Sequence, residues 1–161
     1  LSKLDKKELE MKSVFSYPKW EEIPNINLYL DQVLLYVNQI CPPVSPDKEK
    51  GLTASMVNNY VKHGYLPKPD KKKYQRKQIA RLIAISTLKS VFSIQEIAQT
   101  LNTLHTDTNS EELYNAFVDY MNEDIDPANP IIQASCQTVK LYHQTLTLVY
   151  TEIEEEETNE Y

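Results

Sequence analysis

Glycine and cysteine are both rare in this sequence, with two of each among 161 residues. Two glycines are too few for a glycine-rich loop that binds phosphate, which excludes the common nucleotide-binding motifs. Cys41 and Cys136 lie far apart and lack the spacing of a metal site or a Cys-x-x-Cys redox motif, so we expect reduced thiols and a cytoplasmic protein. No apolar run approaches the roughly 18 residues of a membrane helix, and the N-terminus lacks the apolar core of a signal peptide.

Residues suited to catalysis or metal binding are equally scarce. The three histidines, His63, His105 and His143, have no histidine or carboxylate partner at the spacing of a helical metal site. Ser86 and Lys89 match the Ser-x-x-Lys motif of acyl transfer, but its companion motifs are absent and Ser86 falls on the apolar side of a predicted helix. We therefore expect no enzyme activity, no metal and no cofactor.

Apolar residues recur at intervals of three and four over much of the chain, which is typical of amphipathic helices. The sequence therefore predicts a mainly α protein. Residues 41–52 contain three prolines and are expected to form an extended connector. The predicted helices span residues 28–40, 54–63, 76–89, 94–104, 111–123 and 131–151.

Charge is distributed unevenly along the chain, although the net charge is −6. Residues 1–100 contain 16 Lys and Arg against 10 Asp and Glu, whereas residues 101–161 contain 1 against 13. From Lys62 to Lys89 there are nine basic residues and a single acidic one, Asp70. This asymmetry indicates a basic surface for a polyanion and an acidic second half, with ordinary clustering of charges as the alternative.

Helix 54–63 combines clear end signals with two different faces. Thr53 is a suitable N-cap, and Gly64 stands where a left-handed residue would end the helix. One face is apolar, and the opposite face carries polar side chains: Ser55, Asn58, Asn59 and Lys62. Because asparagine amides can pair with the edge of adenine in the major groove, this polar face is a candidate for reading DNA bases.

A lysine-rich loop follows this helix. Pro67 and Pro69 disfavour helix, so an extended or hairpin-like loop is expected before Tyr74. The loop carries four cations suited to DNA phosphates: Lys68, Lys71, Lys72 and Lys73. The next helix begins with cations that oppose its dipole, so phosphate contact explains them better than local stability does: Arg76, Lys77 and Arg81. The alternative is that the polar face of the helix and the lysine-rich loop are simply exposed to solvent and have no binding role.

Residues 53–67, Thr-Ala-Ser-Met-Val-Asn-Asn-Tyr-Val-Lys-His-Gly-Tyr-Leu-Pro, resemble the second helix and first wing strand of the MerR-type winged helix-turn-helix regulators. The resemblance continues through Tyr74, the helix at 76–89 and the segment from Phe92 to Leu101. Residues 20–104 resemble more closely a bacterial family of unknown function thought to share the MerR-like fold. The resemblance implies a winged helix-turn-helix that binds double-stranded DNA as a transcriptional regulator.

The sequence departs from the MerR pattern at three places. Ser55 replaces the arginine that follows the helix cap, Asn59-Tyr60 replaces an aromatic pair, and the connector at 41–52 replaces a short turn. The missing arginine and the acidic second half favour an alternative function, a non-catalytic protein–protein interaction module on a MerR-like fold.

The predicted organisation has four parts: a peripheral N-terminal arm at 1–19, the MerR-like region at 20–105, a helical region at 106–153 and a disordered acidic tail at 154–161. Helix 131–151 carries an apolar stripe at three-four spacing, including Tyr142, Leu146, Val149 and Ile153. This stripe could pair with its copy in a homodimer, as the C-terminal helices of MerR-type proteins do, or close over the first domain.

Overall fold

Helices dominate the described part of the chain, as the apolar spacing predicts. The structure, a computed structural model, describes residues 15–41, 51–105 and 109–159. Two strands of two residues each form a small sheet beside the helices. In chain order the elements are η1 (Trp20–Glu22), β1 (Leu28–Tyr29), α2 (Leu30–Ile40), α3 (Ala54–Lys62), β2 (Lys73–Tyr74), α4 (Arg76–Leu88), α5 (Ile94–Leu104), α6 (Ser110–Glu123) and α7 (Pro130–Asn159).

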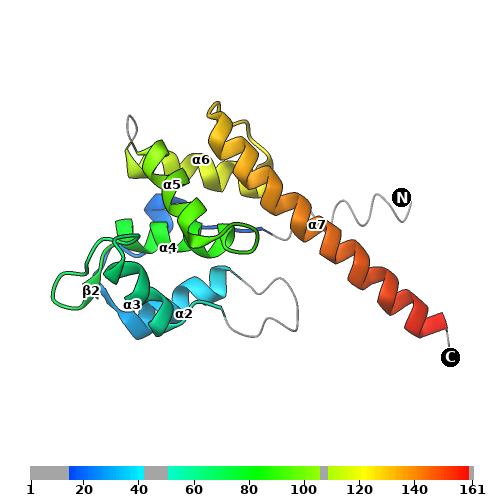
Figure 1. Ribbon diagram of the computed structural model, residues 1–161, viewed down its shortest axis with the longest axis horizontal. Coiled ribbons are helices and arrows are strands. Elements are labelled where there is room, and N and C mark those ends of the chain that lie inside the picture. The colour runs from blue at the N-terminus through cyan, green and yellow to red at the C-terminus, as the bar shows by residue number, and fades with distance from the viewer. Residues whose placement is uncertain (1–14, 42–50, 106–108, 160–161) are drawn as a thin grey trace.

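The fold is organised around α4, which packs against α2, α5, α6 and α7. Figure 1 shows α2 and α3 on one side of α4, and α5 and α6 on the other. Ile79, Leu82 and Ile83 of α4 are completely buried, and they belong to one hydrophobic core that includes residues from all six α-helices of the described chain. This core runs across the boundary that the sequence predicts between residues 105 and 106.

The end signals of α3 are confirmed. The Thr53 hydroxyl accepts a hydrogen bond from the Met56 backbone N–H at 3.2 Å, which satisfies one of the free donors at the helix start. Gly64 has a φ of 75°, the left-handed conformation expected after a helix end. The helix is one residue shorter than predicted, since His63 is its C-cap rather than its last residue.

The prediction that Leu28 and Tyr29 begin a helix is wrong. They form β1, which pairs antiparallel with β2, so that Leu28 lies opposite Tyr74 and Tyr29 opposite Lys73. Helix α2 begins at Leu30, and the Gln32 side chain accepts a hydrogen bond from the Tyr29 backbone N–H at 2.9 Å. The pairing joins the start of α2 to the end of the lysine-rich loop.

The N-terminal arm is not peripheral where the structure describes it. The Tyr17 side chain is buried, and its hydroxyl accepts a hydrogen bond from the Thr87 hydroxyl of α4 at 3.0 Å. The Asn122 side chain of α6 bonds both the backbone N–H and the carbonyl of Tyr17, at 2.9 and 3.0 Å. Residues 1–14 of the predicted arm lie outside the described residues.

Helix α7 is longer than predicted. It continues to Asn159, so the prediction of a disordered tail is wrong for Glu154 to Asn159, while residues 160–161 lie outside the described part. Only Ile132, Cys136 and Val139 of this helix are buried, and its C-terminal half extends away from the other helices (Figure 1). No helix in the described ranges combines the length and apolarity needed to cross a membrane.

Candidate nucleic-acid interface

Helix α3 presents the polar face that the sequence predicts. Ser55, Asn58, Asn59 and Lys62 are all exposed, whereas Val57 and Tyr60 on the opposite face are buried in the core. The division follows from the helical period, because residues three and four apart share a face. Two carboxamides, a hydroxyl and an ammonium group are therefore available to a partner along one side of a nine-residue helix.

The lysine-rich loop ends in a two-residue hairpin turn. The backbone N–H of Asp70 donates to the Lys73 carbonyl at 3.2 Å, and the Lys73 N–H donates to the Asp70 carbonyl at 2.9 Å. Lys71 and Lys72 between them have φ values of 49° and 66°, so both are left-handed, as in a type I′ turn. Asn-Gly is the usual pair at these positions, which makes two lysines there locally unfavourable.

Side chains of α4 and β1 hold the hairpin in place. The buried Gln78 side chain of α4 donates to the carbonyls of Pro67 and Lys68, both at 3.0 Å. At the other end of the loop, the Lys73 ammonium lies 5.2 Å from the centre of the Tyr29 ring, within the range of a cation–π contact. The hairpin thus stands in a fixed position relative to α3, since both pack on the same core.

A groove runs between α3 and the hairpin. Its volume is about 400 Å³, and it brings together one polar residue of the helix with three of the loop lysines. The described lining residues include no carboxylate, although Asp70 lies in the adjacent turn. They are Asn58, Val61, Lys68, Pro69, Lys71, Lys72 and Tyr74. The groove therefore combines hydrogen-bonding and cationic groups within reach of one ligand.

The structure separates the cations of α4 from this groove. The half-buried Arg76 donates from Nε and Nη2 to the Ile23 carbonyl at 3.1 and 2.9 Å. Arg81 donates from Nε to the Tyr65 carbonyl at 2.7 Å, and burial lowers its pKa. Lys77 and Arg81 line a second and larger cavity instead. Both arginines therefore hydrogen-bond backbone carbonyls of neighbouring segments, which gives a structural reason for these two cations on α4.

Sequence reasoning missed some residues of the groove and nearly all of the larger cavity. Val61, Pro69 and Tyr74 line the groove beside the predicted lysines, and their apolar character gave no signal for such a role. The larger cavity draws on segments from residue 20 to residue 136, which no local motif connects. Within the described residues, no three His, Cys, Asp or Glu side chains gather as they would around a metal ion.

A model of a domain family of unknown function, DUF1836, matches residues 18–117. The chain belongs to the DUF1836 family. The DUF1836 match includes α3, the hairpin, α4 and α5, and it ends within α6. Comparisons with curated proteins and with solved structures gave no significant match.

Proposed function

We propose that this DUF1836 protein binds double-stranded DNA through α3 and the lysine hairpin, as a transcriptional regulator of MerR-like winged helix-turn-helix type. The observation that carries the proposal is the shared groove, in which the Asn58 amide lies beside Lys68, Lys71 and Lys72. A helix in the major groove with cations on the flanking phosphates is the common arrangement of this class of DNA-binding protein. The resemblance of residues 53–67 to MerR-type regulators supports the same function.

The two parts of the proposed interface have different tasks. Asn58 and Asn59 would hydrogen-bond base edges, because a carboxamide both donates and accepts, whereas Ser55 and Lys62 would contact bases or the nearest phosphates. The hairpin lysines would bind phosphates, whose charge is independent of sequence. Asn58→Ala is expected to reduce discrimination between sequences by about 1–3 kcal/mol.

Salt dependence of binding tests the hairpin directly. The variant Lys71→Gln/Lys72→Gln and the control Lys19→Gln/Lys89→Gln lose the same charge, but the control positions lie away from the groove. If both hairpin lysines neutralise phosphates, their removal lowers the slope of log K against log salt by about 2, while the control keeps the wild-type slope. Fluorescence anisotropy with a labelled duplex measures both slopes. Equal slopes for the two variants would refute the role of the hairpin and favour a protein-interaction module.

We further propose that α7 forms a homodimer. Leu148, Val149 and Ile153 are 36%, 46% and 44% exposed in the half of α7 that extends from the core. Tyr142, Leu146, Val149 and Ile153 follow the three-four spacing of a coiled-coil seam. Val149→Glu should convert the dimer to a monomer in sedimentation equilibrium. A wild-type protein that stays monomeric at high concentration would contradict this assembly.

A further inference from the structure

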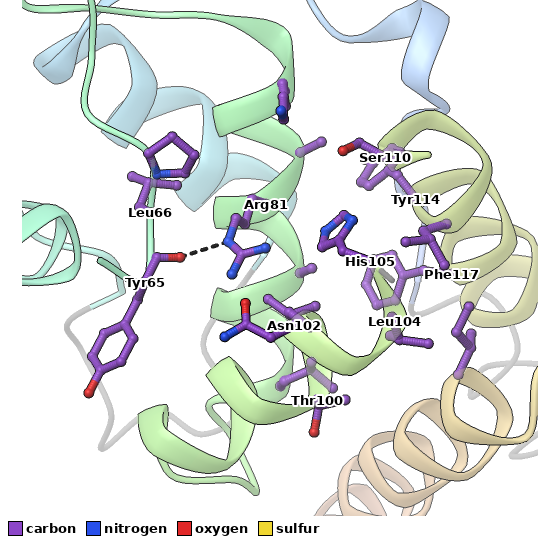
Figure 2. A pocket seen from close by; sticks show the side chains of 18 of the residues that line it. Tyr65, Leu66, Arg81, Thr100, Asn102, Leu104, His105, Ser110, Tyr114 and Phe117 are labelled. Atoms are coloured by element: carbon purple, nitrogen blue, oxygen red, sulfur yellow. Dashed lines mark hydrogen bonds between the residues drawn. The ribbon is translucent and has the colours of Figure 1, made fainter. Parts of the chain in front are cut away.

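The larger cavity is lined along α4 by Lys77, Ala80, Arg81, Ala84 and Leu88. Its volume is about 650 Å³, within the range of sites for drug-sized ligands. Its walls come from α4, α5 and α6, from the segment at 64–68 that joins α3 to the hairpin, and from the start of α7, with single residues from η1 (Trp20) and α3 (Val61). Figure 2 shows lining side chains from α4 (Arg81), α5 (Asn102, Leu104) and α6 (Tyr114, Phe117), while the ring of Tyr65 points away from them.

Most of the cavity wall is apolar. Leu66 and Ala80 are buried at one side, and Leu104, Tyr114 and Phe117 cover the side formed by α5 and α6. The rings of Tyr114 and Phe117 lie 6.1 Å apart, so the wall includes a pair of packed aromatic groups. Such a wall favours an apolar body, because its occupation removes hydrocarbon surface from water on both partners.

One part of the cavity is cationic. Lys77, Arg81 and His105 line the cavity, and Asn102 contributes a carboxamide near Arg81 (Figure 2). Burial lowers the pKa of His105, and the positive charges of Arg81 and Lys77 lower it further. The three groups are therefore close enough to interact electrostatically. Among the described lining residues there is no Asp or Glu.

Within residues 15–41, 51–105 and 109–159, Arg81 has no anionic partner. Its Nε donates to the Tyr65 carbonyl, but the described residues provide no ion pair for its guanidinium group. The two terminal nitrogens of an arginine carry four further donors in a planar arrangement suited to a carboxylate. A half-buried cation without a counter-charge is costly, and an anion that enters the cavity removes this cost.

We propose that this cavity binds a small amphipathic carboxylate, with its apolar body against Phe117 and Leu104 and its carboxylate on Arg81 and Lys77. The apolar wall, the cationic end and the absence of acids from the described lining together select this class over neutral or cationic molecules. The site goes beyond the proposed function and does not depend on it, because the cavity and the α3 groove are distinct apart from shared lining by Val61 and Lys68.

Isothermal titration calorimetry without DNA tests the site, with octanoate as the probe and octanamide as its neutral control. Octanoate is expected to bind one to one and at least tenfold more tightly than octanamide, because only the anion gains charge-assisted hydrogen bonds. Absence of saturable octanoate binding, or equal binding of octanamide, overturns the proposal. Since no duplex is present, either outcome leaves the DNA-binding proposal unaffected.

Variants locate the bound carboxylate. Arg81→Gln should weaken octanoate binding by about tenfold to a hundredfold, and Lys77→Gln should weaken it less. Lys77 is exposed and shows no hydrogen bond to a described residue, so its loss tests the site without disturbing the fold. Lys72→Gln is the matched control, because it removes the same charge from a residue that does not line the cavity. Equal effects of Lys77→Gln and Lys72→Gln would overturn the assignment of the cationic end.

A cavity-filling variant tests the apolar end. Ala84 is half-buried on α4 and lines the cavity, so Ala84→Phe places a ring where the apolar body would lie. Octanoate binding should be lost in this variant while its melting transition remains cooperative. Undiminished binding to a folded Ala84→Phe protein would show that octanoate binds elsewhere, and would refute the proposed site.

Discussion

The two left-handed lysines of the hairpin make a prediction in which stability and binding change in opposite directions. Lys71 and Lys72 occupy positions where asparagine and glycine are preferred. The left-handed conformation costs a non-glycine residue roughly 1–2 kcal/mol, and glycine avoids this cost. Glycine instead loses roughly 0.5–1 kcal/mol because it gives up more backbone entropy on folding. The replacement Lys71→Asn/Lys72→Gly should therefore increase the free energy of unfolding by about 1 kcal/mol.

Thermal unfolding and duplex binding together measure both effects. An increase of about 1 kcal/mol corresponds to a rise in Tm of about 2–4 °C for a chain of this size. The same variant removes two cations from the groove, so its duplex affinity should fall and its salt slope should decrease by about 2. Lys68→Asn is the control for the Tm measurement. Lys68 does not have a positive φ, so its replacement should not raise Tm. A lower Tm for the double variant, or an unchanged duplex affinity, would refute the reasoning.

Three further variants test other parts of the structure. Thr53→Ala removes the N-cap of α3 and should destabilise the protein by about 1 kcal/mol in urea unfolding. Gln78→Leu leaves the carbonyls of Pro67 and Lys68 without their donor, so it should cost about 2 kcal/mol and also weaken duplex binding. Burial lowers the pKa of His143 in the folded protein, so protonation of this residue favours the unfolded chain. The free energy of unfolding should therefore decline as the pH falls below about 6.5, and His143→Gln should reduce this decline.

Each of these variants has a result that would contradict its premise. Thr53→Ala with wild-type stability would mean that the hydroxyl does not cap α3. Full duplex affinity in folded Gln78→Leu would mean that Gln78 does not position the hairpin. For His143, urea unfolding at about pH 7.5 and about pH 5 gives the comparison, with the exposed His63→Gln as control. If both histidine variants lose the same stability between these two pH values, His143 is not the source of the decline in stability at low pH.

Local signals predicted the parts of the fold that local interactions determine. Thr53 and Gly64 marked the ends of α3 because a cap hydroxyl and a left-handed glycine act within one helical turn. At the start of α5 the Ser93 and Glu96 side chains each bond the backbone of the other, which is a local interaction of the same kind. The predicted polar face of α3 followed from the helical period alone.

Features that depend on distant residues could not be predicted in the same way. The strand at Leu28–Tyr29 exists because β2 pairs with it, and two residues carry no periodic pattern of their own. The role of Arg81 as a partner of the Tyr65 carbonyl depends on how α4 packs beside that segment. The larger cavity requires the tertiary arrangement of several helices. In the sequence, Lys77 and Arg81 of its cationic end were visible only as basic residues of a helix and were interpreted as phosphate contacts.

Selection from a pool of randomised duplexes tests the central claim most directly. The purified protein is incubated with the pool at about 150 mM salt, where non-specific phosphate contacts are partly screened, and the bound duplexes are sequenced. The wild type should enrich a motif, and Asn58→Ala should enrich the same motif less sharply. The motif should contain an inverted repeat if α7 forms a symmetric dimer. A bound pool without an enriched motif would contradict the claim that α3 reads DNA sequence.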